Sequence, residues 1–153
     1  MKGQTPITSS SGSWKNLTLQ GVLITTPQGR KTDLLIRSIA GAADADETIH
    51  FLKELRKHLK GRKLLLIWDG LPAHRAKAVT AWIEANSSWL KIVRLPAYAP
   101  ELNPIEYLWG ALKAKHLGNL SDLGAIGKAV QRAKHTMKDT KLLRGFLRAS
   151  GLY

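Results

Sequence analysis

The stretch LLLIWDGLPAHRA, residues 64–76, constrains the fold of this chain more than any other feature. The run from Leu64 to Trp68 is entirely apolar and ends at Asp69, after which Gly70 and Pro72 break the chain. An apolar run of this kind predicts a strand that is covered on both faces, as in a sheet with helices on either side. A carboxylate at the end of such a strand lies at the edge of the sheet where α/β proteins usually bind ligands.

Strand and helix patterns alternate along the rest of the chain. Residues 14–26 and 32–41 are rich in Thr, Val, Ile and Leu and flank Gly29, which predicts a β-hairpin. A second buried strand is predicted at 90–96. The spacing of apolar residues and the capping signals predict helices at 44–61, 74–88, 103–117 and 121–138. This alternation predicts a layered α/β fold, and the length of 153 residues predicts one domain.

The charge balance indicates what the chain binds. The 24 Lys and Arg residues outnumber the 11 Asp and Glu residues, which gives a formal net charge of +13. Such a surface attracts polyanions, so we expect contact with nucleic acid; the alternative is an ordinary solvated surface. The chain has no cysteine, which excludes disulfides and thiolate metal sites, and no apolar run is long enough for a membrane span or a secretory signal. We expect a cytoplasmic protein, associated with the nucleoid if its source is bacterial, with no membrane partner.

Two carboxylates are candidates for chemistry. Asp69 either caps a nearby backbone amide or holds a divalent metal ion. Glu106 follows Asn103 and Pro104 at a predicted helix start, and this is also the pattern of a capping box, in which Glu106 only reaches back to the Asn103 amide. If the two carboxylates converge, they have a further use on a basic protein, because paired carboxylates hold the Mg²⁺ ions that promote attack on a phosphodiester.

Other residues near these carboxylates also have two interpretations. His74 either orients DNA or water near the metal ions, or bonds locally and positions its loop. Basic side chains close to both carboxylates in the sequence either neutralise phosphates or form a solvated surface. They are Arg75, Lys77, Lys113 and Lys115. Tryptophans on apolar faces, including Trp68, are predicted to lie in the core rather than to stack on bases.

The segments LLLIWDGLPAHRAKAVTAWI and VRLPAYAPELNPIEYLWGALK together resemble the second half of the catalytic domain of DDE transposases of the IS630/Tc1/mariner superfamily. The proline-rich approach to Glu106, the Trp109 and Lys113 that follow, and the His74 after the aspartate all match. Gly70 departs from the family, in which Asn is common at this position.

The resemblance implies an RNase H-like fold, with a mixed sheet flanked by helices, and DNA cleavage and strand transfer that depend on Mg²⁺ or Mn²⁺. It implies that Asp69 and Glu106 are catalytic carboxylates that bind the metal ions. His74 and Asn103 are expected to support them.

The same resemblance places the first catalytic aspartate of the family before KGQTPI, and so before Met1. None of Asp33, Asp44 and Asp46 is predicted to lie beside Asp69 and to replace it. We therefore expect an N-terminally truncated domain that is inactive alone. The alternative is a non-catalytic nucleic-acid-binding remnant, or a regulator of an intact transposase. The expected partners are DNA and either further copies of this chain or an intact transposase.

Overall fold

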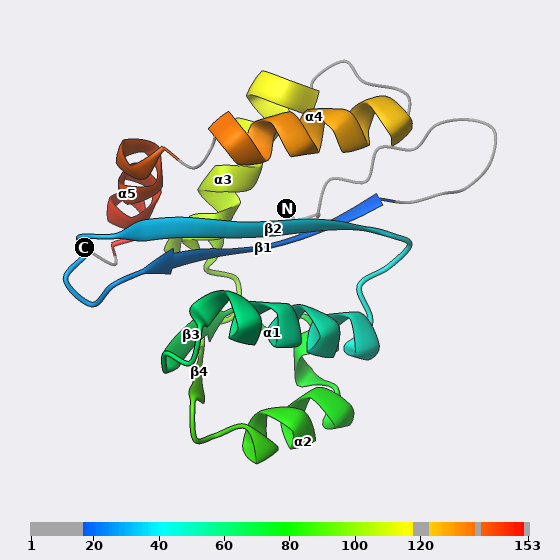
Figure 1. The fold of residues 1–153 in the computed structure, drawn as a ribbon, viewed down its shortest axis with the longest axis vertical. Coiled ribbons are helices and arrows are strands. Elements are labelled where there is room, and N and C mark those ends of the chain that lie inside the picture. Colours follow the sequence, from blue (N-terminus) through cyan, green and yellow to red (C-terminus); the bar gives the residue numbers. More distant parts are fainter. Residues whose placement is uncertain (1–16, 118–122, 137–138, 152–153) are drawn as a thin grey trace. The chain divides into compact units, whose positions relative to one another are not determined.

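The structure is a computed structural model that describes residues 17–117, 123–136 and 139–151 (Figure 1). Its strands are β1 (Leu17–Thr25), β2 (Thr32–Ala40), β3 (Leu64–Trp68) and β4 (Leu90–Arg94). Its α-helices are α1 (Ala45–Leu59), α2 (Lys77–Ala85), α3 (Pro104–Leu112), α4 (Leu123–Thr136) and α5 (Thr140–Ala149). The 3₁₀ turns are η1 (Pro72–Arg75) and η2 (Pro100–Leu102), and η3 (Lys113–Leu117) is a π-helical turn.

The chain divides into two compact units. The hairpin unit consists of Met1–Ala42 and Pro100–Tyr153, and the aspartate unit consists of Ala43–Ala99. No described helix is long and apolar enough to cross a membrane.

The hairpin unit is built on the predicted β-hairpin, which the structure confirms. β1 and β2 pair antiparallel in a register that runs from Leu17 opposite Ala40 to Thr25 opposite Thr32. The hairpin packs with α3, α4 and α5 around one hydrophobic core, because each of these elements carries an apolar stripe. The buried core residues are Leu19, Leu34, Ile36, Leu108, Leu112, Val130 and Leu143.

Gly21 in β1 allows a close approach of the Trp109 ring of α3. A Cβ atom at Gly21 would lie 2.7 Å from Cη2 and 3.1 Å from Cζ2 of that ring. We expect Gly21→Ala to lower the free energy of unfolding by about 1–3 kcal/mol, because the ring or the strand must move.

Denaturation with urea measures this change. The matched control is Gly127→Ala in α4, where an added Cβ would meet nothing within 4 Å. We expect this control to be neutral or slightly stabilising, since alanine is the better helix former. Equal unfolding midpoints for wild type and Gly21→Ala would contradict the close approach.

The aspartate unit is a βαβ arrangement. β3 and β4 pair in parallel, from Leu64 opposite Leu90 to Trp68 opposite Arg94, and α2 lies between them in the chain. Parallel neighbours require such a crossover connection. The predicted helix after Asp44 is confirmed as α1: the Asp44 side chain accepts a hydrogen bond from the Glu47 N–H at 2.9 Å and caps the helix.

The prediction that both faces of β3 and β4 are covered is wrong for the described residues. Leu65 of β3 is 60% exposed and Val93 of β4 is 47% exposed, whereas Leu66 and Trp68 are buried. Alternate residues of a strand point to opposite faces, so one face of this pair is buried and the other is open. A continuous apolar run does not by itself distinguish these two cases.

The helix boundaries differ from the predictions in two places. The helix predicted at 74–88 begins only at Lys77, because the residues from Pro72 to Arg75 form the 3₁₀ turn η1. The helix α5 was not predicted, although the Asp139 side chain caps it by accepting a hydrogen bond from the Lys141 N–H at 2.7 Å. The predicted helix at 103–117 is confirmed as α3 and η3, and the helix at 121–138 as α4, whose expected N-cap lies outside the described residues.

Candidate metal and DNA site

Asp69 directly follows β3, and two local interactions hold its carboxylate. Its Oδ1 accepts a hydrogen bond from the Leu71 N–H at 3.2 Å and lies 2.9 Å from Nδ1 of His74. Both interactions use Oδ1 and, as far as the described residues show, leave Oδ2 for a further ligand. The Asp69 side chain is 38% exposed, so a cation from solvent can reach it.

His74 is held between this carboxylate and the ring of Trp68. The two rings stack with their centroids 4.2 Å apart and their planes 4° from parallel. Nδ1 of His74 also lies 3.3 Å from the backbone oxygen of Asp69. Because both neighbours of Nδ1 are acceptors, we assign the proton to Nδ1. The local interpretation of His74 thus has a geometric basis, while its contact with DNA or water stays a prediction.

The surroundings of Asp69 determine its ionisation. Burial raises the pKa of the Asp69 carboxyl, but the hydrogen bond and the charge of His74, together with the Leu71 N–H, lower it. The net pKa lies below the ordinary value for aspartate. Asp69 is therefore ionised at neutral pH, which is the state that binds divalent cations.

Glu106 lies in the first turn of α3 and is exposed. Asn103 is the N-cap of this helix: the residue is 8% exposed, and its Oδ1 accepts a hydrogen bond from the Ile105 N–H at 3.4 Å. In a capping box the Asn103 N–H would donate to the Glu106 side chain. In this structure it donates to the carbonyl of Pro100 at 3.0 Å. The sequence NPIE thus begins a helix and places an exposed carboxylate on its first turn.

The two carboxylates belong to different units, Asp69 to the aspartate unit and Glu106 to the hairpin unit. Their convergence stays a prediction. Within the described ranges, no group of three or more His, Asp and Glu side chains gathers at one place. Each carboxylate nevertheless fits an oxygen-seeking cation, because Mg²⁺ and Mn²⁺ prefer carboxylate ligands and both side chains are accessible.

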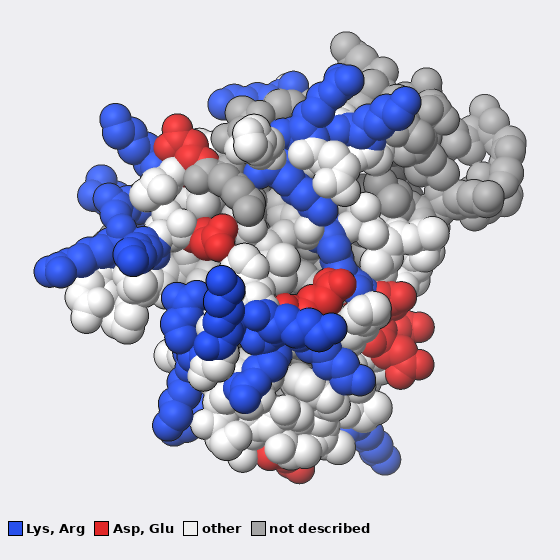
Figure 2. All heavy atoms as spheres, in the orientation of Figure 1, with Lys and Arg blue, Asp and Glu red and all other residues white. Residues whose placement is uncertain are grey.

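The four basic residues predicted to bind DNA are all exposed. Arg75 ends η1 and Lys77 begins α2, so both lie within eight residues of Asp69 in the chain. Lys113 and Lys115 lie in η3, directly after the helix that carries Glu106. Lys and Arg side chains cover much of the face shown in Figure 2. The positions of these residues are compatible with phosphate contacts, which stay predictions.

A family model described as the DDE superfamily endonuclease matches residues 1–125. The chain belongs to this DDE superfamily. The resemblance on which the sequence prediction depends is thereby confirmed. Among curated proteins, none matches the chain significantly.

Solved structures confirm the fold of this DDE chain. The catalytic domain of Mos1 transposase with raltegravir and Mg matches with a TM-score of 0.62 and 18% identity, over 88% of this chain and 78% of that chain. The Mos1 paired-end complex with the left transposon end matches with a TM-score of 0.67 and 17% identity, over 99% of this chain and 46% of that chain. The Mos1 mariner paired-end complex with Mn matches with a TM-score of 0.59 and 18% identity, over 99% of this chain and 48% of that chain.

These similarities show the predicted RNase H-like α/β fold, with small sheets flanked by helices. The DDE chain spans under half the length of the chains in the two paired-end complexes.

Two further residues, Trp68 and Tyr98, were not given a functional role from the sequence. Trp68 was predicted only as a core residue, and it is buried, but it also supports His74. Tyr98 has a φ of 60° and is fully exposed. A left-handed backbone is uncommon for tyrosine and often marks a functional segment. The sequence signal for this unusual loop was the pair of flanking prolines, Pro96 and Pro100, which restrict its backbone.

Proposed function

We propose that this DDE domain acts in transposition, in metal-dependent DNA cleavage and strand transfer, with Asp69 and Glu106 as its catalytic carboxylates. The observation that carries the proposal is the Asp69 site: an ionised carboxylate at the end of a parallel strand, held by His74, in a chain of the DDE superfamily. Two solved relatives in fold contain Mg or Mn, and two are paired-end complexes. We propose the cytoplasm as its location, at the nucleoid in a bacterial cell.

Each site residue has a proposed role. Asp69 and Glu106 bind Mg²⁺ or Mn²⁺, His74 positions the Asp69 carboxylate, and Asn103 begins the helix that carries Glu106. When bound, the cations supply the positive charge that stabilises attack on a phosphodiester. Exposed basic side chains neutralise the phosphates of the bound DNA. They are Arg75, Lys77, Lys113 and Lys115.

We also propose that the chain cleaves DNA poorly on its own. Two carboxylates are a minimal set for such a metal site. Two acidic residues that could replace the missing carboxylate take part in local interactions: Oδ1 of Asp33 accepts a hydrogen bond from the Leu34 N–H at 2.7 Å, and Asp44 caps α1. These local roles count against Asp33 and Asp44 as the third carboxylate.

The second candidate function is a DNA-binding regulator without catalysis. The charge of +13 favours it, since this charge supports DNA binding whether or not the metal site is complete. Such a regulator would associate with an intact transposase or with further copies of this chain. Metal-dependent nicking of supercoiled DNA that Asp69→Ala removes would exclude it.

DNA binding is expected to be indifferent to sequence and to fall steeply with salt. Each neutralised phosphate contributes about −0.9 to the slope of log affinity against log salt concentration. Fluorescence anisotropy with two unrelated duplexes of equal length measures the slope. The double variant Arg75→Gln/Lys77→Gln should reduce its magnitude by about 1.8 if each side chain contacts one phosphate.

The matched control for this charge removal is Lys53→Gln/Lys57→Gln, on the exposed face of α1, which should leave the slope unchanged. A salt-independent affinity, or a strong preference for one duplex, would contradict backbone binding through the basic surface.

A further inference from the structure

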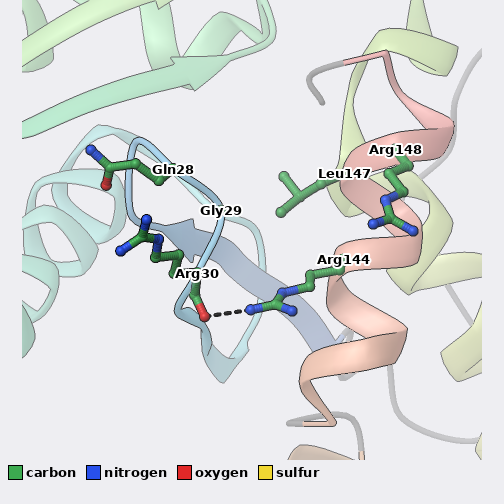
Figure 3. Close-up of a pocket in the computed structure, with 6 residues that line it drawn as sticks. All are labelled: Gln28, Gly29, Arg30, Arg144, Leu147 and Arg148. Atoms are coloured by element: carbon green, nitrogen blue, oxygen red, sulfur yellow. Dashed lines mark hydrogen bonds between the residues drawn. The ribbon is translucent and has the colours of Figure 1, made fainter.

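A cavity of about 220 Å³ lies within the hairpin unit, between the turn that joins β1 to β2 and the helix α5 (Figure 3). It is lined by Gln28, Gly29, Arg30, Arg144, Leu147 and Arg148. Three of these described residues are arginines and none is acidic. A cavity lined in this way is suited to an anion, because arginines brought together without a carboxylate repel one another.

Arg144 is fixed at this cavity. Its Nη2 donates a hydrogen bond to the backbone oxygen of Arg30, and the side chain reaches from α5 toward the hairpin turn (Figure 3). Its Nε is buried and has no hydrogen-bond acceptor among the described residues. A buried charged donor without an acceptor is costly, so an acceptor from a bound ligand would stabilise it.

The other lining residues provide charge and shape. Arg148 follows Arg144 by one helical turn and is exposed, as is Arg30 on the hairpin turn. Leu147 projects toward the turn between them and is 3% exposed (Figure 3). Gly29 has a φ of 65°, a conformation that favours glycine, and its N–H donates to Thr26 to close the turn.

We propose that this cavity binds a phosphate group. Guanidinium groups present N–H donors in a fork that matches phosphate oxygens, and they bind phosphate more specifically than lysines do. On binding, a shift of the Arg144 side chain uncovers its buried Nε–H, which donates to the phosphate, and the charges of Arg30 and Arg148 balance it. We assign the phosphate to the DNA backbone, and this assignment rests on the proposed function. Free phosphate or a nucleotide is the other source of the same chemistry.

The first test follows the Nε–Hε resonance of Arg144 by NMR, in full-length protein with ¹⁵N-labelled arginine. Arg144→Lys assigns the resonance. We expect inorganic phosphate to shift it, and a short DNA duplex to shift it at a lower concentration.

The two ligands separate the outcomes. A shift with phosphate but not with the duplex keeps the phosphate site and makes a free phosphate compound its ligand. If the duplex shifts no arginine resonance, the proposed DNA function is contradicted. The response of the Arg144 resonance to inorganic phosphate then decides whether the cavity binds phosphate. If neither ligand shifts Arg144 while the duplex shifts other arginines, the proposal is wrong.

The second test avoids Arg144, whose hydrogen bond to the hairpin turn also supports the fold. Arg30→Gln/Arg148→Gln changes two exposed side chains. We expect duplex binding about tenfold weaker, with a salt slope smaller in magnitude by about 0.9 for each lost phosphate contact. Lys53→Gln/Lys57→Gln removes the same charge from the aspartate unit, which contributes no residue to the cavity, and should have neither effect. Equal affinities and slopes for the two double variants would overturn the DNA backbone as the ligand.

Discussion

The isolated chain is expected to nick supercoiled DNA at most in trace amounts with Mg²⁺ or Mn²⁺, and to perform no strand transfer. Asp69 and Glu106 supply only two carboxylates, whereas a third normally helps to hold the cations and to balance their charge. Preorganised charge stabilisation is commonly the largest catalytic contribution, and one stabilising group is worth about 10²–10³ in rate. Conversion of supercoiled plasmid to the open circular form measures this activity.

Two variants make this assay specific. Asp69→Ala should remove even the trace of nicking, whereas Glu84→Ala, which removes an exposed carboxylate of α2, should leave it unchanged. Robust nicking by the wild type that Asp69→Ala abolishes would contradict the proposed incompleteness. It would at the same time support the role of Asp69. Nicking that Asp69→Ala does not alter would point to a contaminating nuclease.

The second large effect is expected at His74. We expect His74→Ala to weaken Mn²⁺ binding by about 10–100-fold, the usual range for a residue that orients a metal ligand. The substitution removes the contact of 2.9 Å between Nδ1 and the Asp69 carboxylate, together with the stack on Trp68. The free Mn²⁺ signal in electron paramagnetic resonance measures the affinity.

His74→Asn should lose less affinity than His74→Ala, because the asparagine amide retains a donor near the position of Nδ1. The matched control is His50→Ala on α1, where the side chain is 62% exposed and its Nε2 lies 3.7 Å from Oε1 of Glu54. Equal Mn²⁺ affinities for wild type and His74→Ala would show that Asp69 needs no positioning residue.

Local sequence signals predicted most of the elements. Asp44 as a cap, Asn103 followed by Pro104, and the apolar run before Asp69 each act within a few residues, so sequence alone locates α1, α3 and β3. The open face of the β3–β4 pair could not be predicted, because exposure depends on which elements cover a sheet and not on the apolar run itself.

The candidate site was predictable to a similar degree. Asp69 and His74 are five residues apart, so their contact is local and the loop between them brings it about. The stack of His74 on Trp68 depends on the geometry of η1, which has no distinctive sequence signal. The arginine cavity joins Arg30 to Arg144 across 114 positions of the chain, and only the folded hairpin unit brings these residues together.

The central proposal is that Asp69 and Glu106 hold the same metal ion or ion pair. A double-mutant cycle on Mn²⁺ affinity tests it most directly, with Asp69→Asn, Glu106→Gln and the double variant measured against wild type. If the carboxylates share the site, each single substitution should weaken binding strongly and the second should add little, because the first has already disrupted the site. Additive losses, or an unchanged affinity for Glu106→Gln, would contradict the claim.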